Sequence, residues 1–258
     1  MRRYTDEQIR DYEEGRREWM RRGDDLTDTA LSYPFQNLRA EQFSREGFVR
    51  RLNYLDHAMY RLADIYPPNL IKASRGTVRD AELLVQSFVM NVFGAIDNLA
   101  WVWVLERGIK RPDGKELRRT EVVFDGPQAC TLVESLTPAL HTVICEGGEW
   151  FKALRTYRDG VAHQIPIYIP RLLNEDEAQK ATNLSIAINE AVAARSHKLV
   201  HDLLDERSSL GDYGAFMALN GEQSPMMLHP QMVCDLATVV NLGETLFAEL
   251  NTSVEAIR

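Results

Sequence analysis

The sequence predicts an all-α fold, and three observations carry that prediction. Apolar residues recur at helical spacing along much of the chain, as at Phe48, Leu52 and Leu55. Capping residues and proline or glycine stops stand at the ends of these runs. The main β-branched alternating stretch, residues 165–170, is short and contains two prolines that exclude a helix. We therefore expect a helical bundle with a few short extended segments and loop insertions.

The first expected helix is highly charged. Thr5 and Gln8 form a capping box for a helix over residues 5–22, in which acids and bases alternate at i, i+4. This pattern suits an exposed helix or an arm on a partner subunit. A loop around Tyr33 and Pro34 follows.

Two longer helices come next. One is expected over residues 44–66 and stops at the proline pair 67–68. Thr77 is expected to cap the longest helix, residues 78–107, and Gly108 to end it.

Shorter helices and an extended segment are predicted in the middle of the chain. A turn at 112–114 leads into a short extended segment over 115–124. Short helices divided at Pro138 are expected over 127–145, followed by a helix over 149–163.

The last part predicts two helices with a loop between them. One helix is expected over 174–207, followed by a loop-like stretch at 208–229. Within it, residues 216–228 are compatible with a hairpin turning at Asn220-Gly221. Pro230 suits the first position of a final helix that ends near residue 257.

The 258 residues are expected to form a single helical domain, because no long linker and no internal repeat occurs. Three cysteines without a CxxC pair predict neither a disulfide framework nor a zinc ribbon. The charged N-terminal segment lacks the apolar region of a signal peptide. The apolar stretch 83–105 carries polar residues that favour a core helix over a membrane span. A cytoplasmic location is expected, with no membrane partner.

A formal net charge of -8 argues against broad, nonspecific coating of DNA. A local basic patch can still bind phosphates on an acidic protein. Residues 107–119 hold six basic residues and two acids. The basic residues are Arg107, Lys110, Arg111, Lys115, Arg118 and Arg119. A nucleic-acid contact and a solvated surface turn both explain this run.

The sharpest chemical feature is RDGVAH, residues 158–163. Asp159 and His163 are four residues apart and share one face of the expected helix. Arg158 and His163 lie about 140° apart around the axis. A site that uses both therefore needs the arginine to swing round, a frayed helix end or a second subunit.

These three side chains suit cleavage of RNA without a metal. Histidine titrates near neutral pH and can remove the 2′-hydroxyl proton or protonate the leaving oxygen. Arginine offers a fork of donors that matches phosphate oxygens. Asp159 is expected to orient His163 and to favour its charged form.

The motif resembles the R-x4-6-H motif of the HEPN superfamily, in which a polar residue usually follows the arginine. The apolar helix that carries Asp97 and Asn98 also resembles the core helix preceding that motif. The resemblance implies a HEPN-like core over about residues 44–207, flanked by helices 5–22 and 230–257. It also implies a homodimer in which two motifs meet to form a metal-independent endoribonuclease site.

The resemblance implies site residues and leaves rival functions open. The expected catalytic residues are Arg158, Asp159 and His163, and the expected substrate-binding or site-lining residues are Asp97, Asn98 and Arg155. No cofactor or metal is expected, and RNA is the expected partner. The rivals are a noncatalytic module that binds a nucleotide, a protein partner or an inhibitor, and a structural subunit of a larger assembly.

The same residues also have structural explanations. Arg155, Arg158 and Asp159 suit an exposed ion-pair ladder, worth a few tenths of a kcal/mol. His163 suits the negative end of a helix dipole. Asp97 and Asn98 suit contacts to a neighbouring loop, because an unpaired buried polar group costs roughly 1 to 3 kcal/mol.

Other residues predict no further site. His197 and His201 have a zinc-compatible spacing but no third ligand nearby in the sequence. Trp101 and Trp103 are expected to pack in the core or at a dimer interface rather than to stack on bases.

Overall fold

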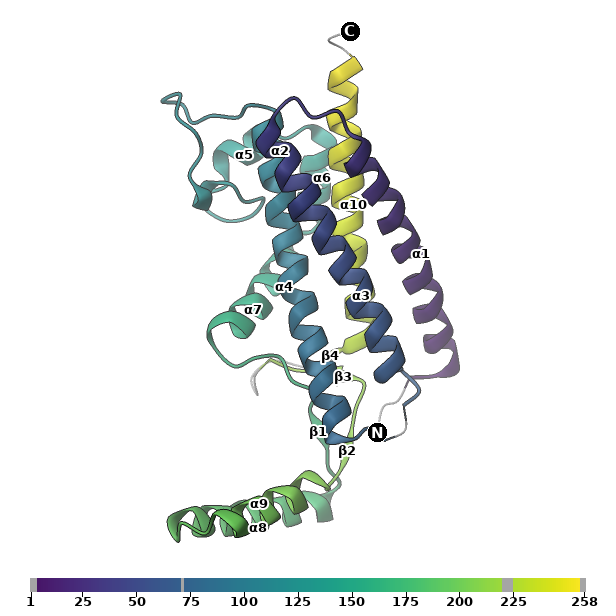
Figure 1. Cartoon of the computed structure of the whole chain (residues 1–258), viewed down its shortest axis with the longest axis vertical. Helices are drawn as coiled ribbons and strands as arrows, with labels where there is room; N and C mark the ends of the chain where they lie inside the picture. Colours follow the sequence, from purple (N-terminus) through teal and green to yellow (C-terminus); the bar gives the residue numbers. More distant parts are fainter. Residues whose placement is uncertain (1–3, 71, 220–224, 256–258) are drawn as a thin grey trace.

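The computed structural model describes residues 4–70, 72–219 and 225–255. The chain is 72% helix and 5% strand, which confirms the predicted all-α fold. Four long helices run side by side along the long axis (Figure 1): α1 (Asp6–Ser32), α3 (Arg50–Ile65), α4 (Arg75–Glu106) and α10 (Leu228–Glu255). Helix α1 packs against α10, and α3 packs against α4.

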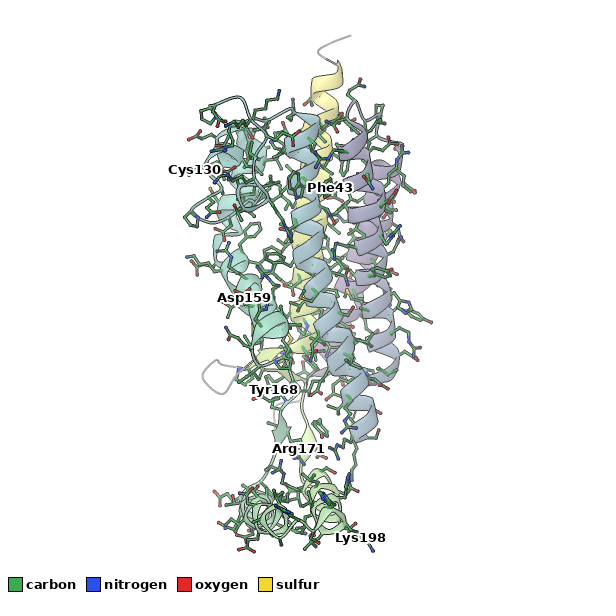
Figure 2. All side chains as sticks on the ribbon, turned by 60° about the vertical axis from the view of Figure 1, so that its left-hand side comes forward. Phe43, Cys130, Asp159, Tyr168, Arg171 and Lys198 are labelled. Carbon is green, nitrogen blue, oxygen red and sulfur yellow. The ribbon has the colours of Figure 1, made fainter. Side chains whose placement is uncertain are left out.

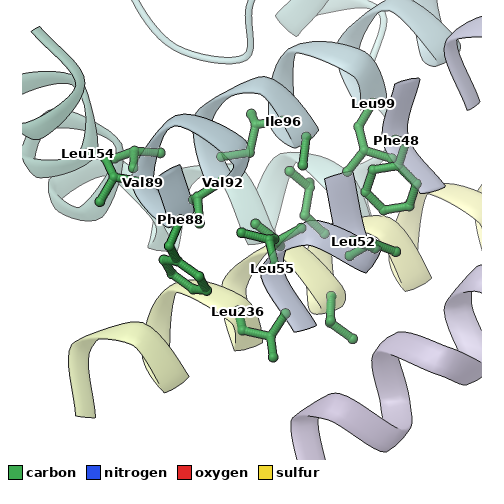
Figure 3. Packing of buried hydrophobic residues seen from close by; sticks show 14 of the residues in the cluster. Phe48, Leu52, Leu55, Phe88, Val89, Val92, Ile96, Leu99, Leu154 and Leu236 are labelled. Carbon is green, nitrogen blue, oxygen red and sulfur yellow. The ribbon is translucent and has the colours of Figure 1, made fainter. Parts of the chain in front are cut away.

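The core of this bundle is apolar and fully enclosed. Leu55 of α3, Phe88 of α4 and Leu236 of α10 are each at most 2% exposed and approach one another at the centre (Figure 3). One continuous cluster of buried side chains joins these helices to Leu154 of α7 (Gly148–His163). The rigid packing of such a core fixes the helix faces that form the site described below.

Helix α1 corrects the prediction of an exposed helix or arm ending near Arg22. It continues to Ser32 and lies along α10, because Gly23, Leu26 and Ala30 form a buried stripe in its second half. Most of its charged residues are exposed, whereas Arg22 pairs with Glu244 of α10. The predicted capping box of Thr5 and Gln8 is present.

The helix expected over 44–66 consists of two segments, and a further short helix precedes it. A short α2 (Leu38–Gln42), capped by Asn37, leads into a π-helical segment (Phe43–Val49), and α3 follows. Helix α3 ends at Ile65, directly before Tyr66 and the predicted proline stop.

Helix α4 begins three residues earlier than expected. Ser74, rather than Thr77, is its cap and accepts a hydrogen bond from the Thr77 N–H. Gly108 follows the helix with φ +62°, as its predicted role as a stop requires. Helix α4 is long and apolar enough to cross a membrane by length and composition alone, but 56% of its most apolar window is buried inside the bundle.

The segment between α4 and α7 is largely irregular. The expected extended stretch at 115–124 contains a bridge from Lys110 to Glu116 and a 3₁₀ turn (Arg119–Glu121). Two short helices follow, α5 (Cys130–Glu134) and α6 (Pro138–Glu146), divided as predicted at Pro138.

The helix expected over 174–207 is instead a helical hairpin of α8 (Glu175–Ala193) and α9 (His197–Ser208). No proline or glycine marks the break, which lies at Arg195 with φ +54°. The reversal lets Leu184, Ile188 and Ala191 of α8 pack against α9.

Two small antiparallel ribbons complete the fold. The first joins β1 (Arg171–Leu172) to β2 (Asp212–Tyr213) and carries the α8–α9 hairpin. The second joins β3 (Phe216–Met217) to β4 (Met226–Met227), which confirms strand pairing within the predicted 216–228 hairpin. Its expected turn at Asn220-Gly221 lies outside the described residues. Pro230 is the third residue of α10, not the first.

Candidate functional site

One face of α4 forms the floor of an open cleft of about 570 Å³. Residues of α4 that line it recur at helical spacing and so share one face. The walls come from α3, from the segment 119–123 and from α7, which lies beside α4 in Figure 2. The lining residues are Arg51, Met90, Phe93, Gly94, Asp97, Trp101, Arg119, Thr120, Val122, Val123 and Arg158. We call this space the arginine cleft, because it holds three arginines and one carboxylate.

Two amide side chains of α4 hold Arg51 in place. Its Nε donates to the Asn98 Oδ1 at 3.1 Å, and its Nη1 donates to the Asn91 Oδ1 at 3.1 Å. The planar guanidinium is thereby fixed against the surface of α4. A cation fixed in this way loses little side-chain entropy when it binds an anion.

Gly94 makes room for this arginine. A Cβ at position 94 would lie only 2.3 Å from the Arg51 Cζ, far closer than atoms of two residues approach. Glycine inside a helix costs roughly 0.5 to 1 kcal/mol relative to alanine. The guanidinium of Arg51 packs directly against the backbone of α4 at Gly94. This contact explains why a glycine lies in the middle of α4.

Arg158 reaches the arginine cleft from α7. Its Cζ lies 4.4 Å from the centre of the Phe93 ring, a cation–π contact. Its Nη1 lies 2.9 Å from the Asp159 Oδ1. Its Nε is buried and has no hydrogen-bond partner among the described residues.

Asp97 is the acidic group of the cleft. Burial raises the pKa of its carboxyl, and the positive charges of Arg158, Arg119 and Arg51 act against that rise. The three arginines leave the cleft positive even when Asp97 is ionised. Within an acidic protein, this is a local positive site.

The predicted basic run 107–119 divides between structural contacts and the cleft. Arg107 stacks over Trp103 at 4.7 Å, and Arg111 lies 3.8 Å from Asp113. Arg119 lines the cleft. One residue of the run therefore joins the candidate site, while these two arginines stabilise the surrounding fold.

The structure separates the residues of the RDGVAH motif. Arg158 lines the cleft, whereas His163 is exposed at the last residue of α7 and is not among the lining residues. Asp159, expected to orient His163, instead pairs with Arg158. This separation follows from the angle of about 140° between positions five apart on a helix.

The other predicted site residues have distinct positions. Asp97 lines the cleft, whereas Asn98 is not among the lining residues and instead accepts a hydrogen bond from Arg51. Arg155 donates to the Asp125 carboxylate at 2.8 Å and to its carbonyl at 3.1 Å. Arg155 thus ties α7 to the segment whose preceding residues, 119–123, form a wall of the cleft.

Sequence reasoning missed Arg51, Phe93 and Gly94, and it assigned Trp101 to packing alone. Trp101 is half-buried, lines the cleft and stacks on Phe43, with ring centres 5.2 Å apart and planes 8° apart. The glycine inside an apolar helix was the one signal in the sequence. Arg51 comes from another helix, and its position depends on tertiary packing.

No group of three or more histidine, cysteine or acidic side chains in the described part of the chain is placed to hold a metal ion. Comparison with known proteins gives no match to a protein-family model, to a curated protein or to a solved structure.

Proposed function

We propose that this chain binds RNA, with phosphate groups held in the arginine cleft. The observation that carries the proposal is the Arg51 guanidinium, fixed by Asn91 and Asn98 beside an open, positive cleft. Arginine forks match phosphate oxygens, and phosphate contacts supply most of the affinity of nucleic-acid binding.

The aromatic residues of the cleft support a nucleic acid over a simple anion. Trp101 and Phe93 line the same space as the arginines. Aromatic side chains beside a positive groove suit stacked, unpaired bases. The HEPN-like motif in α7 points to the same class of ligand, because Arg158 belongs to both.

Binding of a labelled single-stranded RNA oligomer, measured by fluorescence anisotropy, tests this function. Arg51→Ala is expected to weaken binding at least about tenfold, the loss of one charge-assisted contact. Gly94→Ala is expected to weaken it as well while removing no charge, because the new Cβ would displace the guanidinium.

Arg61→Ala is the matched control, since Arg61 is an exposed arginine of α3 that pairs with Asp64 outside the cleft. Its affinity for the RNA is expected to stay within about twofold of that of the unmodified chain. Equal affinities for all four proteins would reject RNA binding in the cleft. Binding of inorganic phosphate alone, without RNA, would restrict the site to small anions.

Metal-independent cleavage of RNA is a second candidate. The observation that favours it is an exposed His163 on the helix whose Arg158 enters the cleft. In that reaction the 2′-oxygen loses its proton and attacks the adjacent phosphorus. A 2′,3′-cyclic phosphate forms, and the 5′-oxygen leaves with a proton. In this mechanism His163 acts at a cleft that is completed by a second copy of the chain.

Cleavage is tested in excess chelator with the unmodified chain, Arg158→Ala and His163→Ala. Both variants are expected to lose cleavage, whereas His197→Ala, which changes an exposed histidine elsewhere, is expected to retain it. Cleavage that persists in His163→Ala, or that the chelator abolishes, would reject this mechanism. Binding without cleavage would leave the noncatalytic function.

A further inference from the structure

Phosphate binding does not explain the carboxylate of Asp97, which lines the arginine cleft. A negative charge beside three arginines repels the phosphate that they attract. Within the described part of the chain this carboxylate has no hydrogen bond or ion pair, and neither of its oxygens is sealed in the interior. An ionised carboxylate accepts hydrogen bonds and donates none. Asp97 is therefore placed to accept hydrogen bonds from a donor group of the bound molecule.

Two aromatic residues flank Asp97 on the same face of α4. Phe93 and Trp101 lie four residues before and after it, which is about 6 Å along the helix axis on either side. The Arg158 guanidinium lies over the Phe93 ring at 4.4 Å, and Trp101 stacks on Phe43. Aromatic rings in a positive cleft support flat bases by stacking. A base stacked beside either ring would bring an edge close to Asp97.

The arginines supply hydrogen-bond donors beside this acceptor. Arg51 uses its Nε and Nη1 to bind Asn98 and Asn91, and among the described residues its Nη2 has no partner. Arg119 likewise makes no hydrogen bond or ion pair with any residue that the structure describes. The cleft therefore combines one pair of acceptor oxygens with guanidinium donors that are free to bind a ligand.

Guanine is the standard base whose edges match this combination. Its Watson–Crick edge presents two adjacent donors, N1–H and the N2 amino group, which suit the two oxygens of one carboxylate. Its Hoogsteen edge presents the O6 and N7 acceptors, which an arginine fork binds. Adenine and cytosine have a ring acceptor next to their amino group, and uracil has a carbonyl on each side of N3–H. In these three bases an acceptor would face the carboxylate.

We propose that the arginine cleft binds an unpaired guanine and that Asp97 is the residue that selects this base. The inference rests on the proposed binding of RNA in the same cleft and adds a base preference to it. Two hydrogen bonds from guanine require the ionised carboxylate. Burial raises the pKa of Asp97, and the positive charges of Arg158, Arg119 and Arg51 oppose that rise. The arginines thus favour the form that accepts both hydrogen bonds.

Fluorescence anisotropy with labelled short oligouridines tests the base preference. Each oligomer carries one central guanosine, adenosine, cytidine or inosine, because a single guanosine avoids the self-association of guanine runs. The guanosine oligomer is expected to bind about tenfold more tightly than the adenosine or cytidine oligomer. Inosine lacks the N2 amino group, so its oligomer is expected to bind about fivefold more weakly than the guanosine oligomer.

Asp97→Asn separates base selection from a defect in folding. Asparagine keeps one oxygen but replaces the other with an amino donor, and this pair matches adenine. The ratio of the two affinities is therefore expected to reverse, so that the adenosine oligomer binds more tightly than the guanosine oligomer. Loss of a negative charge raises the affinity for every oligomer alike, so the ratio is the readout. Asp80→Asn, which changes an exposed carboxylate of α4 outside the cleft, is the matched control and is expected to keep the guanosine preference.

The outcomes distinguish this inference from RNA binding itself. Equal affinities for all four oligomers, each still weakened by Arg51→Ala, would overturn the guanine preference and leave RNA binding in the cleft. A guanosine preference that is unchanged in Asp97→Asn would overturn the assignment of base selection to Asp97. If none of the oligomers bound, the proposed function would be rejected together with the inference.

Discussion

The four-helix body and the α8–α9 hairpin are both helical, yet they are stabilised very differently. Leu55 and Phe88 in the body are 0% exposed and belong to one continuous core, whereas the hairpin buries three residues of one helix. The three buried polar residues among those described, Ser44, His229 and Asp235, all lie in the body. The comparison indicates that the body is packed firmly enough to position a site, whereas the hairpin can open locally.

The largest expected difference concerns one substitution made in each region. Leu55→Ala in the body is expected to cost 2–5 kcal/mol of unfolding free energy, roughly the range for a buried leucine. Leu184→Ala in the hairpin is expected to cost under about 1 kcal/mol of global stability, because the hairpin can open locally. Urea unfolding of the two variants and of the unmodified chain measures both losses of unfolding free energy.

Hydrogen exchange then locates the effect. Leu184→Ala is expected to speed exchange in α8 and α9 while leaving α3 and α4 protected. Equal losses from the two substitutions would show that hairpin and body unfold together, and would remove the contrast between them.

The next effect comes from His229, which is buried where α10 meets Tyr4 and Tyr66. Its Nε2 donates to the Tyr66 carbonyl at 2.8 Å, and burial lowers its pKa to about 4 from an ordinary value of 6.5. Below pH 6.5 the unfolded chain binds a proton that the buried ring does not. Stability is therefore expected to fall as the pH drops from 6.5 towards 4, by up to about 3 kcal/mol.

Urea unfolding between pH 8 and pH 4 measures this dependence. His229→Gln keeps an N–H donor but cannot titrate, so its stability is expected to change less over this range. The same slope in the variant and in the unmodified chain would assign the acid sensitivity to other groups.

A gain of stability is expected from Asp235→Asn. Trp150 Nε1 and Gln231 Nε2 each donate to the Asp235 Oδ1 at 2.7 Å, and burial raises the pKa of this carboxyl to about 6. Stability is lost as the pH rises through that value, because the folded state must then hold a buried charge. At pH 8 the variant is expected to gain about 1 to 3 kcal/mol, and at pH 4 the gain disappears.

Thermal unfolding at the two pH values checks this prediction. A variant less stable at pH 8 would mean that the ionised carboxylate strengthens its two hydrogen bonds by more than its burial costs.

The smallest expected effect is at the contact between Arg155 and Asp125. The two side chains are 42% and 29% exposed, so solvent screens their attraction. Arg155→Lys is expected to cost about 1 kcal/mol or less. Because this contact ties α7 to the wall of the cleft, RNA affinity is expected to fall more than stability does. An unchanged affinity would limit Arg155 to a surface ion pair.

Part of the candidate site could be predicted from sequence. Arg158 and Asp97 were expected to share a cleft, because a charged motif and a polar pair in an apolar helix are both visible as local patterns. Arg51 was not expected in the cleft, because nothing near it in the sequence indicates that it packs against Gly94. His163 was expected to act with Arg158, but the turn of the helix places it outside the cleft of its own chain.

Local patterns were enough to predict the helical class, the proline and glycine stops and the helix that carries Arg158, because spacing, caps and stops act within a few residues. Tertiary structure alone decided that α1 lies along α10, that residues 174–207 fold back at Arg195, and that Arg51 enters the cleft. Each of these depends on burying an apolar face or a guanidinium against a segment distant in the chain. Local spacing describes that face and does not identify the segment that covers it.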